Sequence, residues 1–257
     1  MQTDLFWESH SRNRQMLYNK INALKESTDI IILPEMFPTA FSMTPSPIAE
    51  PAFGESFQWM KETAKNKGAV IAGSIPTEDK GKYYNRFYWV QPNGEFYQYD
   101  KKHLFTFAGE HNEYTPGETK TIINYKGWKF LPLVCYDLRF PVWSKNNFNE
   151  KTGFDYDCLI YVANWPKPRS KAWKTLLMAR AIENQCYVIG VNRVGKDNNN
   201  NEYSGDSAVI NAKGEMLSNI KPDEETNETL VISYEELITF RQNFKLGPDW
   251  DKFTINK

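Results

Sequence analysis

The sequence predicts a mixed α/β fold in a single domain spanning residues 1–257. Apolar runs of strand length alternate along the chain with segments whose apolar residues recur at helical spacing. Two hairpin signals interrupt this alternation and indicate antiparallel pairs. No repeat, low-complexity tract or linker divides the chain. We therefore expect helices that cover the faces of sheets within one domain.

The expected strands are short runs of apolar or alternating residues that end at turn signals. Most are apolar throughout, which is typical of strands buried on both faces. A first strand could occupy only residues 2–6, which is short for the start of an α/β domain. The other strands are expected at residues 30–33, 69–74, 129–135, 158–163 and 187–192, with hairpins at 83–99 and 207–215.

Three segments carry the apolar spacing of amphipathic helices. They are residues 11–25, 57–67 and 171–185. Gly68 is a plausible C-cap of the second helix, because glycine adopts the left-handed conformation that ends many helices. The third helix is the clearest, since its apolar residues form one continuous stripe.

Composition and charge exclude several classes of function. Hydrophobic residues make up 40% and charged residues 25%, as in ordinary globular proteins. The formal net charge of −1 argues against nucleic acid or a membrane surface as partner, since both attract clustered Lys and Arg. No apolar run approaches the ~20 residues that span a bilayer, and the N-terminus does not resemble a signal peptide. The three cysteines indicate reduced thiols in a cytoplasmic protein.

Reactive side chains follow three of the expected strands. Glu35 follows the run Ile-Ile-Leu-Pro, Lys101 follows the strand that ends at residue 99, and Cys135 follows Phe-Leu-Pro-Leu-Val. In α/β folds, ligands bind beyond the ends of strands. We therefore treat these three residues as candidate catalytic residues.

Cys135 has two interpretations. A free cysteine is more often a buried packing residue than a nucleophile. However, the polar residues that follow it break the apolar run at once, which places the thiol at the edge of a sheet. The backbone N–H of Tyr136 would then be free to donate to an oxyanion. These features favour a nucleophile.

A cysteine nucleophile needs a proton acceptor, and two kinds are available. Glu35, at the end of a buried strand, is the better general base, although it could equally lie in a loop or pair with an arginine. His103 and His111 lie near Lys101 in the sequence and could instead form a Cys–His pair, which we keep as the competing mechanism. Lys101 and Lys102 would point to opposite faces if they lay in a strand, so one of them could stabilise a thiolate or an oxyanion.

Three sequence motifs resemble the catalytic motifs of the nitrilase, or carbon–nitrogen hydrolase, superfamily. They are Leu-Pro-Glu-Met-Phe at 33–37, Tyr-Asp-Lys-Lys-His-Leu-Phe at 99–105 and Val-Cys-Tyr-Asp-Leu-Arg-Phe-Pro at 134–141, and they occur in the family's order. Further similar segments lie at 163–166, 180–185 and 203–207. The resemblance therefore covers nearly the whole chain.

The resemblance implies a four-layer αββα sandwich. It also implies Cys135 as nucleophile, Glu35 as general base and Lys101, rather than Lys102, as the oxyanion-stabilising lysine. Glu110, shortly before a Pro-Gly pair, fits the position of the family's second active-site glutamate better than Glu113 does. No metal or cofactor is implied, and the sequence shows no ligand spacing for a metal.

The likeness is greatest to the omega-amidase branch, whose members hydrolyse the terminal amide of 2-oxoglutaramate or 2-oxosuccinamate. A nitrilase or an N-carbamoyl amino acid amidohydrolase would use the same three residues with another pocket, and a non-catalytic binding module would need none of them. The family also implies a homodimer or higher homo-oligomer. The aromatic segment from about residue 234 could form an oligomer contact.

The residues that bind the substrate are harder to predict. A substrate carboxylate would need a cation, and Arg139 is a candidate, although it could instead brace the turn by pairing with a carboxylate. Phe41, Trp165 and Trp173 could wall a small pocket. Each of these three aromatic residues could equally belong to the core.

Overall fold

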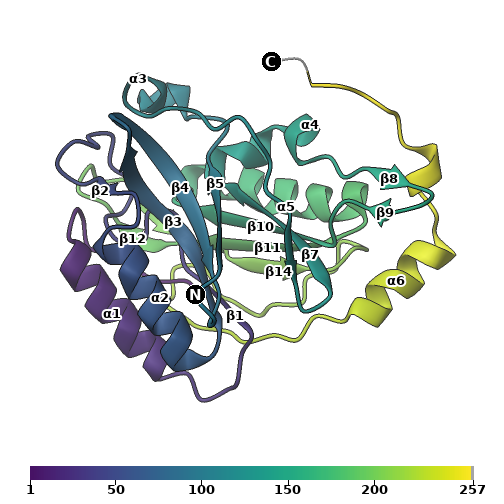
Figure 1. The fold of residues 1–257 in the computed structure, drawn as a ribbon, viewed down its shortest axis with the longest axis horizontal. Coiled ribbons are helices and arrows are strands. Elements are labelled where there is room, and N and C mark those ends of the chain that lie inside the picture. Colours follow the sequence, from purple (N-terminus) through teal and green to yellow (C-terminus); the bar gives the residue numbers. More distant parts are fainter. Residues whose placement is uncertain (256–257) are drawn as a thin grey trace.

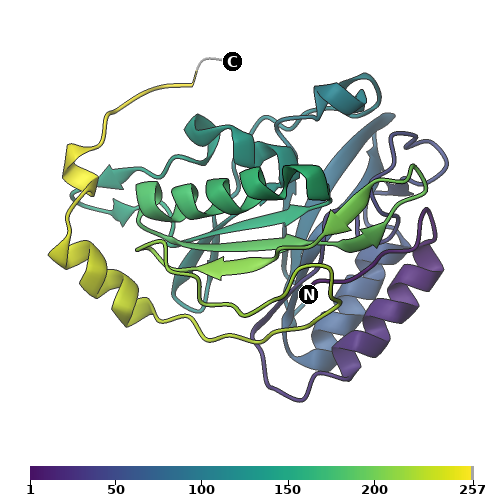
Figure 2. The ribbon, with the colours of Figure 1, turned by 180° about the vertical axis from the view of Figure 1, so that it is seen from behind.

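The computed structural model describes residues 1–255 and folds them as four layers. Two sheets pack face to face, and helices cover the outer face of each sheet (Figure 1). Seen from behind, α5 covers one sheet while α1 and α2 lie beyond the other (Figure 2). This is the αββα sandwich that the resemblance of the sequence motifs implies.

The first sheet comes entirely from the first half of the chain. Its strand order is β1-β3-β4-β5, with β2 paired to the end of β3. β1 runs parallel to β3, while β3, β4 and β5 form an antiparallel meander. The strands are β1 Ile30–Ile32, β2 Glu50–Pro51, β3 Val70–Asp79, β4 Lys82–Val90 and β5 Phe96–Asp100.

The second sheet comes from the second half of the chain. Its order is β14-β11-β10-β7-β6, and the three central strands are parallel. Small hairpins β8–β9 and β12–β13 lie outside it. The strands are β6 Ile123–Tyr125, β7 Trp128–Val134, β8 Phe148–Asn149, β9 Gly153–Phe154, β10 Cys158–Ala163, β11 Tyr187–Asn192, β12 Val194–Lys196, β13 Glu202–Ser204 and β14 Ala208–Ile210.

Three longer helices form the outer layers. α1 (His10–Asn22) and α2 (Glu55–Lys67) lie against the first sheet, and α5 (Ser170–Asn184) lies against the second. α2 ends at Gly68, whose φ of 68° places it in the left-handed region expected of a C-cap glycine. The shorter helical segments are α3 (Glu110–Glu113), α4 (Pro141–Ser144), η1 (Thr106–Ala108), η2 (Cys135–Arg139), η3 (Lys167–Arg169) and η4 (Gly247–Asp249).

The C-terminal segment folds back onto its own chain. It contains α6 (Tyr234–Asn243), which begins at Ser233, where the side-chain oxygen accepts a hydrogen bond from the N–H of Glu236. Arg241 of α6 forms a buried ion pair with Asp157 at 2.6 Å. This helix docks on the second sheet, and the segment between residue 234 and Trp250 has partners within the chain.

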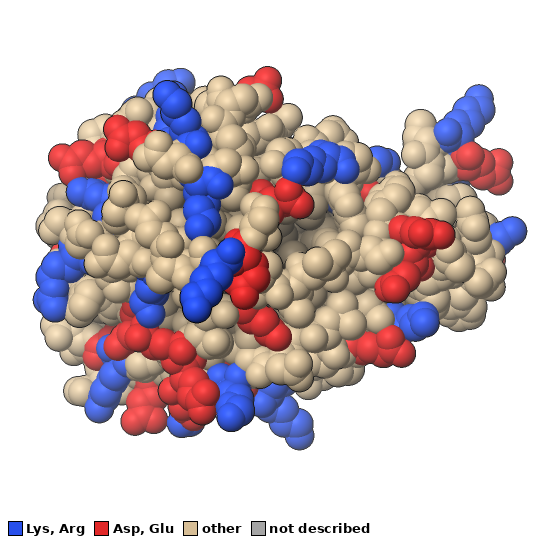
Figure 3. All heavy atoms as spheres, turned by 90° about the horizontal axis from the view of Figure 1, so that it is seen from below, with Lys and Arg blue, Asp and Glu red and all other residues tan. Residues whose placement is uncertain are grey.

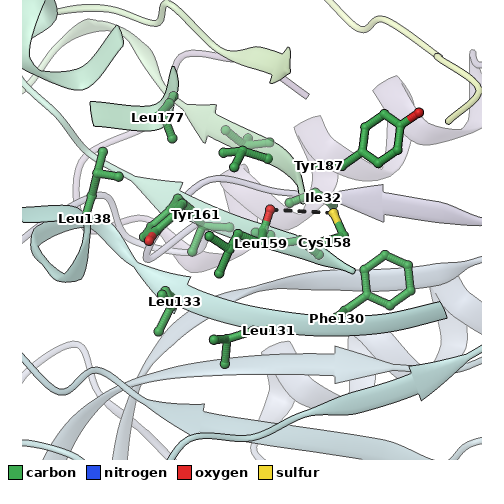
Figure 4. Packing of buried hydrophobic residues seen from close by; sticks show 14 of the residues in the cluster. Ile32, Phe130, Leu131, Leu133, Leu138, Cys158, Leu159, Tyr161, Leu177 and Tyr187 are labelled. Carbon is green, nitrogen blue, oxygen red and sulfur yellow. Dashed lines mark hydrogen bonds between the residues drawn. The ribbon is translucent and has the colours of Figure 1, made fainter. Parts of the chain in front are cut away.

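The core lies between the two sheets and beneath the outer helices. Cys158 is fully buried in it, and its thiol contacts the carbonyl oxygen of Leu159 at 3.6 Å (Figure 4). Cys186 is also fully buried. Both cysteines are packing residues of the core. Among residues 1–255, no helix is long and apolar enough to cross a membrane.

The expected helices and the strands of both sheets are present with small shifts of their ends. The first strand is reduced to one isolated bridge between Gln2 and Thr226. Several elements lack a counterpart in the sequence analysis: the strands β2 and β6, the hairpins β8–β9 and β12–β13, the helix α6 and the shorter helical segments. In the view of Figure 3, charged residues of both signs are intermixed over the surface, in keeping with the small net charge.

Candidate active site

The ends of strands from both sheets meet at a cavity of about 220 Å³. Glu35 follows β1 and Lys101 follows β5 in the first sheet, whereas Cys135 follows β7 and Asn164 follows β10 in the second. Cys135 and Asn164 line this cavity. The candidate residues therefore converge because both sheets present the carboxyl ends of their strands to one place.

Cys135 occupies a strained turn between β7 and the short helix η2. Its φ of 44° lies in the left-handed region, where a residue with a side chain is less stable by roughly 1–2 kcal/mol. The turn leaves the thiol partly exposed on the wall of the cavity. The N–H groups of a helix's first turn have no partner within the helix, so the N–H of Tyr136 is available as an oxyanion donor.

A fully buried carboxylate, Asp137, holds this turn in place. Its Oδ2 accepts hydrogen bonds from Val134 N at 3.0 Å and from the hydroxyl of Tyr99 at 2.7 Å. Its Oδ1 accepts from His103 N at 2.9 Å and contacts His103 Nδ1 at 2.8 Å. Tyr99 belongs to the first sheet and Val134 to the second, so Asp137 also connects the two sheets.

Glu35, Lys101 and Glu110 form a fully buried cluster of charges beside Cys135. Lys101 Nζ lies 3.0 Å from Glu35 Oε1 and 2.9 Å from Glu110 Oε2. Glu110 Oε2 also accepts a hydrogen bond from Phe105 N at 2.6 Å. Buried charges are stable only when paired, and one lysine here is shared by two carboxylates.

Two asparagines fix the carboxylate of Glu35. Asn85 Nδ2 donates to Glu35 Oε1 at 2.7 Å, and the backbone N–H of Asn164 donates to Glu35 Oε2 at 2.7 Å. Asn164 Nδ2 donates to the carbonyl oxygen of Glu35 at 2.7 Å. Each carboxylate oxygen of Glu35 is therefore held in one orientation.

The backbone of Lys101 is fixed as firmly as its side chain. Its N–H donates to Asn85 O at 3.0 Å, and its carbonyl oxygen accepts from Gly117 N at 2.9 Å. A Cβ at position 117 would lie 2.0 Å from Asp100 O, so only glycine fits there. Lys102 is partly exposed and lies over the ring of Trp143 at 5.5 Å. Lys101 is therefore the lysine of the cluster.

Burial and neighbouring charges together shift the pKa values of the cluster. Burial and the nearby carboxylate of Glu35 raise the pKa of the Cys135 thiol well above its usual range, and Lys101 opposes this in part. Burial alone would lower the pKa of Lys101, but the charges of Glu110 and Glu35 raise it. Burial raises the pKa of Glu110. The resting site therefore holds a neutral thiol and a charged lysine.

The histidines of the competing mechanism have other partners. His103 pairs with Asp137 and stacks on Phe140, with ring centroids 3.8 Å apart. His111 is exposed on α3, and His10 lies on α1, where it contacts Ile48 O at 2.7 Å. The structure thus brings two carboxylates, and not an imidazole, to Cys135.

The predicted pocket residues fall into two groups. Phe41, Trp165, Tyr136 and Arg139 line the cavity. Trp173 does not: it is fully buried behind Trp165 and donates its indole N–H to Asp206 O at 2.8 Å. The expectation that Trp173 walls the pocket is therefore corrected, because its helix turns it toward the core.

The structure contradicts one of the two interpretations of Arg139, in which it pairs with a carboxylate. Within residues 1–255 it forms no ion pair, and its guanidinium lies 4.8 Å from the centroid of Trp165 instead. It does not brace the turn through a carboxylate. That task falls to Asp137, and to Arg180, whose Nη2 donates to Leu138 O at 2.7 Å.

Sequence reasoning missed several residues of this site. Asn85 and Asp137 orient the catalytic groups, and Arg169 and Tyr203 line the cavity. Asn164 lies in a segment that resembles the family, yet its contact with Glu35 joins residues far apart in the sequence. Only the Cys-Tyr-Asp run gave a local signal, because an acidic residue two positions after the cysteine can cap the turn.

No site for a metal is evident in the described part of the chain. Within residues 1–255, no group of three or more His, Cys, Asp or Glu side chains could hold a metal ion. The arrangement instead offers a thiol, a fixed carboxylate, a fixed ammonium and a free backbone N–H. These groups suit nucleophilic attack on a carbonyl or nitrile carbon.

The chain belongs to the carbon–nitrogen hydrolase family, whose model matches residues 2–239. It is an enzyme of that family, with the fold and motifs that its sequence predicts.

Individual relatives agree with this family. The chain is 42% identical to an omega-amidase, YafV, of Yersinia enterocolitica over 99% of its own length and 96% of that protein. It is 33% identical to a 2-oxoglutaramate amidase of Bacillus subtilis over 85% and 83% of the two chains. A similar crystal structure is that of XC1258 from Xanthomonas campestris, a CN-hydrolase superfamily protein with an arsenic adduct in its active site. The two structures superpose with a TM-score of 0.96 at 40% identity, over 99% of this chain and 97% of that one.

Proposed function

We propose that the protein is an omega-amidase that hydrolyses the terminal amide of 2-oxoglutaramate or 2-oxosuccinamate. The observation that carries the chemistry is the buried Glu35–Lys101–Glu110 cluster beside the Cys135 thiol. The substrate class rests on the likeness to omega-amidases and on the cavity, whose small volume and arginine side chains suit a short anionic amide. The products would be a 2-oxo acid and ammonia.

The first half of the cycle forms a thioester. Glu35 takes the proton of the Cys135 thiol as sulfur attacks the amide carbon, and the C–S bond forms. The ammonium of Lys101 and the N–H of Tyr136 stabilise the negative oxygen of the tetrahedral intermediate. Glu35 returns the proton to the amide nitrogen, the C–N bond breaks, and ammonia leaves.

The second half of the cycle hydrolyses the thioester. Glu35 removes a proton from water, which attacks the thioester carbon with the same oxyanion donors. The C–S bond then breaks, and the thiol of Cys135 regains its proton. Glu110 serves throughout by holding Lys101 charged and in place, because it neutralises the ammonium from the other side.

An ammonia-release screen tests the function directly. It compares 2-oxoglutaramate, 2-oxosuccinamate, glutamine, simple nitriles and N-carbamoyl amino acids at equal concentrations. We expect kcat/KM to be largest for the two 2-oxo acid amides. A preference for nitriles or for carbamoyl compounds would reject the omega-amidase and leave the catalytic cluster standing, whereas no turnover of any compound would favour a binding module.

We also propose a cytoplasmic homodimer. All three cysteines are unpaired, which fits a reducing compartment. Met178 and Ile182 are exposed on the outer face of α5, with 39% and 46% of their surface accessible, and offer an apolar contact for a second copy. The segment from residue 234 adds Phe244, which is 55% exposed. Light scattering of the wild type and of Ile182→Glu tests this, with a monomeric wild type as the contrary result.

A further inference from the structure

Two arginines line the catalytic cavity without a carboxylate partner. Arg139 lies over Trp165, and Arg169 lies with its guanidinium 5.4 Å from the centroid of Phe105. Both side chains are partly buried, and within residues 1–255 neither forms an ion pair. Aromatic faces hold each guanidinium in position but leave its N–H groups free for a ligand.

The lack of a carboxylate partner sets Arg139 and Arg169 apart from the other buried or partly buried arginines. Every other arginine with a buried or partly buried side chain contacts a carboxylate, and these are Arg14, Arg86, Arg180, Arg193 and Arg241. The remaining one, Arg12, is exposed and stacks on Phe6 at 3.8 Å. Unpaired guanidinium groups are therefore confined to the surface and to the cavity.

The carboxylate that lines the cavity, Asp197, forms no ion pair with either arginine in the described residues. Asp197 accepts hydrogen bonds from Asn201 N at 2.9 Å, from Asn201 Nδ2 at 2.9 Å, from Asn199 N at 2.8 Å and from the hydroxyl of Tyr203 at 2.8 Å. With both oxygens occupied, Asp197 shapes a loop at the cavity. The N–H groups of Arg139 and Arg169 are therefore left without a carboxylate partner in the cavity.

The two arginines come from different elements. Arg139 ends η2, four residues after Cys135, and Arg169 ends η3, which follows β10. Trp165 connects them, because its ring lies against Arg139 while its Nε1–H donates to the carbonyl oxygen of Arg169 at 2.9 Å. Trp165 thus contacts both residues, and each guanidinium group lies against an aromatic side chain of the cavity wall.

We infer that Arg169 is a specificity-determining residue that, together with Arg139, binds the 2-oxo acid end of the substrate. The inference rests on the proposed function and names the group that Arg169 recognises. A 2-oxo carboxylate presents three acceptor oxygens and no donor, which matches two guanidinium groups that carry donors only. The α-ammonium of an amino acid such as glutamine would meet two like charges. Arg169 thereby favours 2-oxo acid amides over amino acid amides.

Steady-state kinetics on Arg169→Gln test this role. The measurement is kcat/KM for 2-oxoglutaramate, glutamine and pentanamide, an uncharged amide of the same chain length. We expect the ratio of 2-oxoglutaramate to pentanamide to fall by roughly 10- to 100-fold, mainly through KM, because hydrogen bonds to a charged group are lost. Arg169→Lys restores part of the ratio, since it keeps the charge but not the planar fork.

Arg12→Gln is the matched control. It removes a guanidinium that is also stacked on an aromatic ring but lies outside the cavity, so the ratio should stay at its wild-type value. Binding of 2-oxoglutarate, followed by tryptophan fluorescence, should weaken in Arg169→Gln and not in the control. Unchanged ratios and unchanged binding in Arg169→Gln would overturn the role of Arg169. A wild type that does not hydrolyse 2-oxo acid amides would instead overturn the proposed function, and fluorescence would still report on Arg169.

Discussion

Two cavities of the molecule differ in what surrounds them. The larger, of about 290 Å³, begins where β1 and β7 start and is lined by apolar side chains such as Ile30, Trp128 and Ile189. The smaller, of about 220 Å³, lies where the same two strands end. Only the smaller cavity adjoins buried charges and a thiol in a strained turn.

This difference shows that volume does not identify the functional site. Two charged residues at the rim of the larger cavity, Asp29 and Lys126, are exposed and pair with each other, so water screens them. In the cluster at Cys135, by contrast, full burial makes every charge depend on its partner.

Replacement of Cys135 should abolish turnover. Cys135→Ala removes the nucleophile but changes little of the packing around it. The thermal midpoint should therefore stay close to that of the wild type. The matched control is Cys158→Ala, which removes a buried core thiol and should keep kcat while lowering stability by roughly 1 kcal/mol. Residual wild-type activity in Cys135→Ala would contradict the mechanism.

Glu35→Gln and Lys101→Met should each lower kcat by roughly 10²–10⁴-fold, because each removes an acid–base or oxyanion group. Lys101→Met also leaves two buried carboxylates unpaired, which should cost about 3–5 kcal/mol of stability. Circular dichroism should therefore accompany the kinetics. Lys102→Met, on a partly exposed lysine, is the control and should behave as wild type.

The Cys135 thiol should remain protonated at neutral pH. Because burial and the carboxylate of Glu35 raise its pKa well above the ordinary value of 9.0, almost none of it should be thiolate at pH 7. The ultraviolet difference spectrum between wild type and Cys135→Ala measures this. Since the folded state holds the proton more tightly, its contribution to stability is full below pH 9 and is lost as pH rises toward the folded pKa. A thiolate signal at pH 7 would instead show that the ammonium of Lys101 outweighs burial and the carboxylate of Glu35.

His103→Ala should lower activity only a few-fold. The imidazole contacts Asp137, not the thiol, so its loss weakens the support of the turn and should cost about 1 kcal/mol of stability. His111→Ala, on an exposed residue, should have no measurable effect. If either change were as severe as Cys135→Ala, a histidine base would replace Glu35 in the mechanism.

Bulky substitutions in the two cavities give the smallest effect and the most direct contrast. Leu230→Trp fills part of the larger cavity and should leave kcat/KM within about twofold of wild type, as surface changes away from functional groups do. Ala108→Trp narrows the catalytic cavity and should raise KM. Equal losses in both variants would show that the larger cavity also takes part in function.

The sequence predicts the strands that position the site better than it predicts the contacts between them. β1, β7 and β10 are recognisable because buried strands carry continuous apolar runs. The residues that follow them are recognisable because a polar side chain after such a run must lie at a strand end. The αββα layers themselves follow from the resemblance to the family.

Contacts across the sandwich leave no such local trace. Asn85 reaches Glu35 from β4 over a separation of 50 residues, and nothing in the alternating strand marks it. Trp173 carries the same apolar character as Trp165, and only the direction in which α5 turns it decides that it is core. For α6 a signal did exist, since Ser233 followed by Glu236 is the start of a capping box.

The division of the chain into two consecutive sheets has a consequence for the assembly of the active site. Residues up to 117 supply Glu35, Lys101 and Glu110, while residues from 123 onward supply Cys135, Asn164 and both cavity arginines. A chain cut between them would leave a base without a nucleophile and a nucleophile without a base. Activity recovered on mixing two such fragments would therefore report that the two sheets had reassembled.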